Sequence, residues 1–218
     1  MNKSFLIILI FIAGSLNAFG QKKTKIDTLE VYQISFTEKP QTIKLVKYSN
    51  DEYSGNIKTK LRKGKSYWSS SWFGKAWKNI WDIDSKVITD NLPIDKSIAK
   101  NLITELKNNG IETIIDCDQV EECKNYQFLD GNSIGFEIKT KEIKRDYYFY
   151  EIHPLKDNNL EKIELRKQAQ KLVSILYKHI DLDKEFTNTF KRIPKGPYHY
   201  SYGAGIVSLS NKKHKKKD

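Results

Sequence analysis

The chain is poor in the residues that would place it in several specialised classes of protein. It has 2 cysteines, 5 prolines and 11 glycines among 218 residues. Two cysteines cannot build the dense disulfide framework of a small secreted scaffold, and so few prolines and glycines exclude a collagen-like or low-complexity chain. The composition therefore predicts an ordinary globular protein, with room for one domain or two small ones.

The sequence also lacks the short motifs that mark common catalytic sites. The serine run 69–71 has no Gly-x-Ser-x-Gly pattern around it, and the glycines at 203 and 205 are not followed by the lysine of a phosphate-binding loop. None of the four histidines forms a ligand pair at helical spacing or stands in a recognisable triad. This pattern favours a protein that is not an enzyme and that uses no cofactor and no metal.

Only one long apolar run is present, at residues 5–13, and a single basic residue, Lys3, precedes it. A membrane-spanning helix needs roughly twenty apolar residues, so a run about half as long is typical of a cleaved secretory signal peptide. Small residues follow it, which predicts cleavage near Gly20, with Ala18 as the alternative. The mature chain is then expected to be secreted or periplasmic and to keep no integral membrane span.

Basic side chains outnumber acidic ones, 38 to 27, which gives a formal net charge of +11. A basic exported protein can bind lipid phosphates or acidic polysaccharides. A solvated lysine-rich surface with no dedicated ligand explains the same composition. The expected partner is another protein or an anionic component of the envelope, such as a glycan or a lipid headgroup, and nucleic acid is not favoured.

The two cysteines, Cys117 and Cys123, have five residues between them, and several of these and their neighbours are acidic. In an oxidising compartment such a pair predicts a local disulfide that fixes the intervening loop. A metal site is the alternative. However, a calcium loop would need a glycine at its bend, and a zinc site would need histidines nearby. The residues therefore favour the disulfide.

All four tryptophans lie within one short segment that also contains lysines. Trp68 and Trp72 fall at helical spacing, as do Trp77 and Trp81, and Lys75 stands between the two pairs. Aromatic rings beside cations can stack on sugars or bases, so Trp68, Trp72, Lys75 and Trp77 form a candidate ligand-binding set. The alternative, which the residue types favour, is that the same rings cover the sheet as part of the core.

The hydrophobic pattern predicts an α+β fold. An antiparallel sheet, or more than one, is expected to carry an amphipathic helix near 95–109 and a long helix near 160–180 on one face. Lys58, Lys60 and Arg62 should form a basic ladder on the solvent face of one strand, and Arg166 should lie on the solvent face of the long helix. Strands are expected at 29–36, 43–48, 53–62, 111–116, 134–139 and 147–152, the last covered on both faces, and a short helix at 181–191.

Four regions follow from these patterns. They are the signal peptide (1–20), an N-terminal β-rich region with the tryptophan segment (21–92), an α+β region (93–193) and a flexible basic C-terminal tail (194–218). Two lobes and a single mixed sheet fit this layout almost equally well.

Taken together, these features favour an exported, non-enzymatic protein with a basic surface, acting as a binding or accessory protein of the cell envelope or the extracellular space. A small secreted hydrolase for a polyanionic substrate is one alternative, with His153 or His199 and a carboxylate as its chemical groups. A periplasmic inhibitor or immunity-type protein is the other, because the acidic loop 116–122 could fill a basic cleft.

Overall fold

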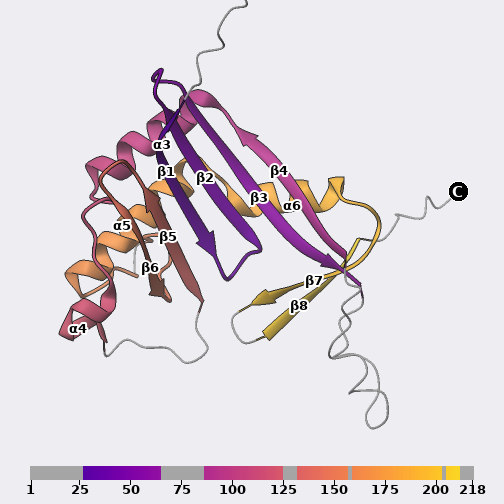
Figure 1. Cartoon of the computed structure of the whole chain (residues 1–218). Coiled ribbons are helices and arrows are strands. Elements are labelled where there is room, and N and C mark those ends of the chain that lie inside the picture. Colours follow the sequence, from indigo (N-terminus) through magenta and orange to yellow (C-terminus); the bar gives the residue numbers. More distant parts are fainter. Residues whose placement is uncertain (1–26, 65–85, 125–131, 157–158, 203–204, 212–218) are drawn as a thin grey trace, which may run out of the picture.

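The computed structural model describes residues 27–64, 86–124, 132–156, 159–202 and 205–211. It is an α+β protein in which an eight-stranded antiparallel sheet curls into a half-barrel and helices pack against it (Figure 1). The predicted fold class is therefore confirmed. The tryptophan segment with its candidate residues Trp68, Trp72, Lys75 and Trp77 lies outside the described residues.

All strand pairs in the described part of the sheet are antiparallel, and their order is β6-β5-β1-β2-β3-β7-β8, with β4 also paired to β3. The regions 21–92 and 93–193 both contribute strands, so they share one sheet. The strands are β1 (Thr28–Phe36), β2 (Gln41–Tyr48), β3 (Tyr53–Lys63), β4 (Lys86–Ile94), β5 (Ser133–Lys139), β6 (Lys144–Tyr150), β7 (Gly196–Tyr202) and β8 (Gly205–Asn211).

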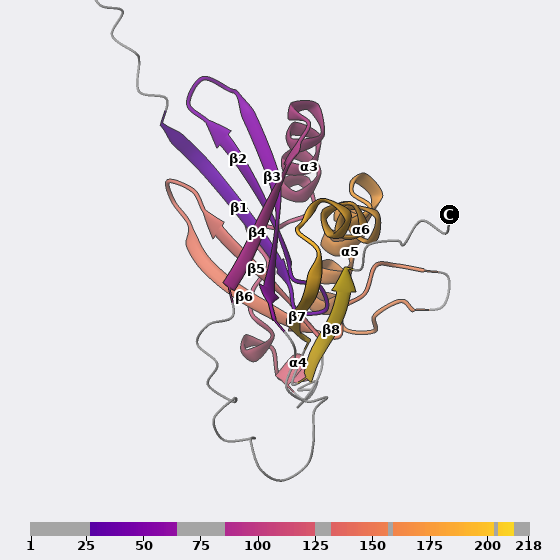
Figure 2. The same cartoon turned by 90° about the vertical axis from the view of Figure 1, so that its right-hand side faces the viewer.

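The three longer helices lie on the same side of the sheet (Figure 2). They are α3 (Lys96–Asn108), α5 (Glu164–His179) and α6 (Leu182–Arg192), while η2 (Cys117–Gln119) and α4 (Glu121–Lys124) are single turns. Asp95 caps α3 by accepting a hydrogen bond from the backbone N–H of Ser97, as its position predicts. Within the described residues, no helix is both long and apolar enough to cross a membrane.

The core consists of two hydrophobic clusters on the helical side of the sheet. The larger one lies under α3 and α5 and contains fully buried rings such as Tyr32 and Tyr147. The smaller one, formed by Leu61, Ile193 and Tyr198, is covered by partly buried aromatic residues of α6. Burial of this second cluster attaches β7 and α6 to the end of β3.

A row of polar side chains lies between the two clusters. Gln41, Thr59 and Asp90 are register partners across β2, β3 and β4. The side-chain polar atoms of Gln41 and Thr59 are buried, and they have no hydrogen-bond partner among the described residues. Asp90 accepts hydrogen bonds from Thr189 (2.9 Å) and Arg192 (2.7 Å) of α6. These contacts connect α6 to the polar row.

Two segments differ from the predicted secondary structure. Residues 111–116 do not form the expected strand, because the backbone N–H groups of Thr113 and Ile114 bond to the carbonyl of Gly110 and close a turn. Ile111 and Ile114 are both buried, at the spacing of a helical turn. The second segment, 196–211, was expected to belong to the flexible tail. It forms the β7–β8 hairpin instead, because Tyr198 is buried against α6.

The prediction that β6 is covered on both faces is also wrong. Tyr147 and Phe149 are buried, but Tyr148 is 49% exposed and Tyr150 is 42% exposed. The helices cover only one face of the sheet, so the outer aromatic residues of β6 remain in contact with solvent (Figure 2).

Candidate functional site

The sheet is interrupted beside the far end of β3, and this interruption creates a pocket. Residues 41–47 of β2 pair with β3 only as far as Thr59, whereas β3 continues to Lys63. Beyond the end of β2, Arg62 and Lys63 pair with β7. The opening between the β1–β2 turn and β7 has a volume of about 390 Å³. We call this opening the sheet notch; Figure 1 shows the elements that flank it, the β1–β2 turn and β7.

Three cationic side chains from two parts of the sheet line the notch. Lys60 and Arg62 come from the outer face of β3, where they are exposed and alternate with buried Thr59 and Leu61, so the predicted basic ladder is confirmed. The third cation, Lys39, comes from the β1–β2 turn. Their convergence is a consequence of the early end of β2, which brings a turn lysine beside the ladder.

Lys39 is held in position from the α5–α6 side. Its ammonium group lies 2.7 Å from Asp183 and 5.5 Å from the ring centroid of Tyr177, and only 12% of its side chain is exposed. Burial acts to lower the pKa of Lys39, but the hydrogen bond and charge of Asp183, together with Tyr177 and Glu38, outweigh burial and raise it. Lys39 is therefore a fixed cation at neutral pH.

His199 of β7 completes the notch opposite Arg62 in the strand register. Its Nδ1 atom is buried, and no hydrogen-bond partner for it exists among the described residues. A buried ring nitrogen without a partner costs stability unless a ligand or water satisfies it. Tyr200, which also lines the notch, packs edge-on against Phe186, and burial raises its pKa, so its hydroxyl stays neutral.

Glycines shape the junction beside the notch. Gly64, directly after β3, has φ +151°, and Gly196, at the start of β7, has φ +146°. L-residues rarely adopt this backbone conformation. A side chain at Gly196 would also meet Lys63 at 3.4 Å. The two glycines thus allow β7 to pair with the part of β3 that extends beyond the end of β2.

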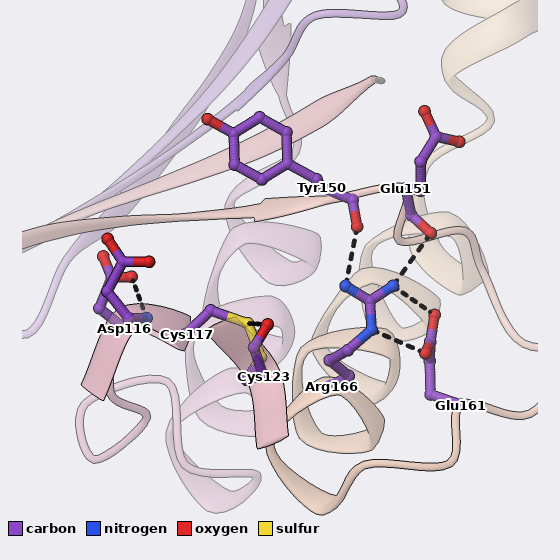
Figure 3. Close-up of a disulfide and its surroundings, with 8 residues drawn as sticks. Asp116, Cys117, Cys123, Tyr150, Glu151, Glu161 and Arg166 are labelled. Atoms are coloured by element: carbon purple, nitrogen blue, oxygen red, sulfur yellow. Dashed lines mark hydrogen bonds and ion pairs between the residues drawn. A yellow bond between two sulfur atoms is a disulfide. The ribbon is translucent and has the colours of Figure 1, made fainter. Parts of the chain in front are cut away.

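The disulfide loop is a separate feature at the other end of the sheet, where α4 lies in Figure 1. Cys117 and Cys123 are bonded, as their spacing predicts (Figure 3). Asp116 begins the loop by accepting a hydrogen bond from the backbone N–H of Asp118. In the described part of the chain, no three His, Cys, Asp or Glu side chains gather so as to hold a metal ion.

A shallow hollow of about 770 Å³ lies between this loop and α5, but its lining side chains do not form a set of groups suited to one ligand. Some of its polar side chains have partners: Gln168 donates to the carbonyl of Gly110 (3.3 Å), and Lys167 pairs with Glu164 (3.1 Å). The hollow is larger than the notch, but among the described residues it has no buried side-chain polar atom without a hydrogen-bond partner, whereas the notch has Nδ1 of His199. We therefore take the notch as the candidate site.

The two histidines considered for hydrolysis are not brought together. His153 contacts Glu151 at 3.3 Å, and the adjoining cavity is about 10 Å³, too small for more than one water molecule. His199 lies in the notch, opposite a cation. His179, the other described histidine, bridges α5 to Glu105 of α3 at 2.8 Å, a structural contact.

The basic ladder could be found from the sequence because it follows the two-residue period of one strand. The rest of the notch could not, because Arg62 and His199 are brought together only by pairing between distant strands. No protein-family model, curated protein or solved structure matches the chain. The class that the geometry defines is thus an α+β protein with a curled, interrupted sheet and a cationic pocket at the interruption.

Proposed function

We propose that this chain is an exported, non-enzymatic binding protein that holds an anionic group of a cell-envelope or extracellular glycan in the sheet notch. The observation that carries the proposal is the convergence of Lys39, Lys60 and Arg62 beside the unpartnered Nδ1 of His199. A phosphate, sulfate or carboxylate offers the negative charge and the acceptor oxygens that such a set of donors requires.

The size and openness of the site also support a polymer ligand. A volume of about 390 Å³ lies within the range of ligand pockets, so the notch can take one charged group with part of the attached sugar. Lys58 extends the row of cations along β3 beyond the notch. A linear polyanion could therefore follow the ladder while one of its charged groups enters the notch.

Charge reversal at the notch tests this proposal. The double variant K60E/R62E should bind dextran sulfate at least about tenfold more weakly than the parent at physiological salt, because two attractive contacts become repulsive. Affinity can be measured by titration calorimetry, with polyphosphate and anionic lipid vesicles as additional probes to identify the chemical source of the anion.

The matched control is K141E/K144E, which makes the same change in net charge at exposed residues of the β5–β6 turn and the start of β6, at the opposite end of the strand order. It should change the affinity for dextran sulfate by less than about twofold, since exposed charges beyond a Debye length are screened. An equal loss of affinity in both double variants would mean that binding follows overall charge, and the notch would lose its role.

Export is part of the same proposal, and it rests on the N-terminal pattern and on the Cys117–Cys123 bond, since disulfides persist in oxidising compartments. Intact-mass analysis of the protein expressed in its natural host should give a chain that begins at or near Gln21 and is two hydrogens lighter than the fully reduced form. A chain that retains Met1 and both free thiols would contradict export.

A further inference from the structure

In the described part of the sheet β8 is a free edge, and the direction of its backbone groups follows from one hydrogen bond. The carbonyl of Pro197 on β7 accepts from the backbone N–H of Gly64, so Pro197 faces β3. Backbone groups alternate in direction along a strand, and Pro197 pairs with Ser210. It follows that Ile206, Ser208 and Ser210 direct their N–H and C=O groups away from β7, where no strand is present among the described residues.

This edge lacks two of the features that usually prevent strands from pairing with other chains, namely charged residues and proline. Charged residues and proline commonly protect free edges. The edge strand β6 begins Lys-Arg-Asp, and β4 contains Asp90 and Pro93. In contrast, β8 reads Gly-Ile-Val-Ser-Leu-Ser-Asn, without charge or proline, and Ile206 is 50% exposed.

We propose that β8 pairs antiparallel with β8 of a second copy of this chain, about a two-fold axis at Ser208. In this register Ser208 lies opposite Ser208 of the second copy, and Ile206 lies opposite Ser210. All three outward-facing residues of each strand then exchange hydrogen bonds, and the seven residues of β8 overlap completely.

Side-chain chemistry favours a second copy as the occupant. The register places Val207 opposite Leu209 of the second copy, twice, and both residues are half-buried on the face that carries the smaller core cluster. An uncharged strand offers nothing that selects a charged peptide, whereas a second copy places aliphatic residues opposite each other on this face and Ser208 opposite Ser208 on the other.

The basic C-terminal residues do not oppose this pairing. In an antiparallel pair, the two copies of Asn211, the residue that precedes the basic run in the sequence, lie at opposite ends of the joined strands. Six steps of about 3.4 Å separate those ends by roughly 20 Å. This is more than two Debye lengths at physiological ionic strength, a distance at which exposed charges are largely screened.

Position-specific cross-linking tests the pairing and its register. With a mild oxidant, Ser208→Cys should give a disulfide-linked dimer, because the two Cα atoms would lie about 5.5 Å apart, within disulfide range. Ile206→Cys is the matched control. Four residue steps would separate its two copies by more than 10 Å, so it should not cross-link to itself. Cross-linking of both variants, or of neither, overturns the proposal.

A proline at position 208 supplies an independent measurement. Because the Ser208 N–H points outward, Ser208→Pro removes no hydrogen bond to β7, and proline is tolerated on such edges. Sedimentation equilibrium should show a dimer dissociation constant at least about tenfold higher than in the parent, whereas Ser208→Thr should keep the parent value. If circular dichroism shows that S208P has lost its fold, the exposed-site variant Ile206→Lys replaces it. A parent that stays monomeric at all concentrations, or a dimer unaffected by these changes, contradicts the proposal.

Discussion

Replacing Arg166 with alanine is expected to lower the free energy of unfolding by about 3–5 kcal/mol. Arg166 is only 2% exposed, and its Nε and Nη2 atoms each donate to the carboxylate of Glu161 at 2.8 Å (Figure 3). Its Nη1 atom also donates to the carbonyl of Tyr150 at 3.0 Å. Alanine would leave a largely buried carboxylate and the carbonyl at the end of β6 without a donor.

The neighbouring residue gives the control for this experiment. Lys167 lies on the exposed side of α5 and pairs with exposed Glu164, so Lys167→Ala should cost less than about 0.5 kcal/mol. Urea denaturation followed by circular dichroism would measure both variants. Equal and small losses for R166A and K167A would show that the Arg166 contacts do not stabilise the fold.

Arg166 also shows a limit of sequence reasoning. The helical period places it among the charged residues of α5, and the sequence therefore predicted a solvent-facing side chain. The prediction is wrong because the end of β6 packs on this part of the helix. There the guanidinium of Arg166 donates to the backbone carbonyls of Tyr150 and Glu151. Nothing in the spacing of α5 itself contains that information.

Helices and strands that are specified by residues within their own segment of the sequence were predicted well. The capping side chain of Asp95, the apolar stripe of α3 and the glycine at position 110 together placed that helix within a residue or two. The β5–β6 hairpin and α6 were also found, because their periodicity is visible within about fifteen residues. The disulfide followed from the spacing of the two cysteines and the predicted oxidising compartment.

Elements stabilised by distant partners were missed. β4 contains Thr89-Asp90-Asn91 and Pro93, which favour a turn, yet it pairs along β3 over nine residues. β7 and β8 were predicted to belong to a polar tail. They form strands because β7 pairs with the edge of β3 and residues of α6 pack against the hairpin. The notch exists only through these long-range pairings, and so only its basic ladder could be predicted.

Alkaline pH is expected to destabilise this protein steeply, because buried tyrosines must ionise. Burial, reinforced by hydrogen bonds to Glu112 and Glu30, raises the pKa of Tyr32, and burial raises the pKa of Tyr147. Above pH 10 the unfolded chain loses both phenolic protons and the folded protein retains them. The folded state then binds more protons, so the free energy of unfolding falls with rising pH, by about 1.4 kcal/mol per pH unit for each residue.

The variant Tyr147→Phe isolates one of these contributions. At pH 8 it should cost about 1–2 kcal/mol, because the Tyr147 hydroxyl donates to the buried carbonyl of Ile111 at 2.6 Å. Between pH 10 and 11 its unfolding free energy should fall about 1 kcal/mol less than that of the parent, so the two curves converge. Tyr148→Phe alters the adjacent ring on the solvent face of β6, and it should leave the alkaline slope of the parent unchanged.

Urea denaturation at pH 8, 10 and 11 measures the unfolding free energy of all three chains. Parallel curves for Y147F and the parent would show that Tyr147 ionises without unfolding. Convergence would instead tie the alkaline limit of the fold to the aromatic core beneath α3 and α5, where Tyr147 stacks against Phe136.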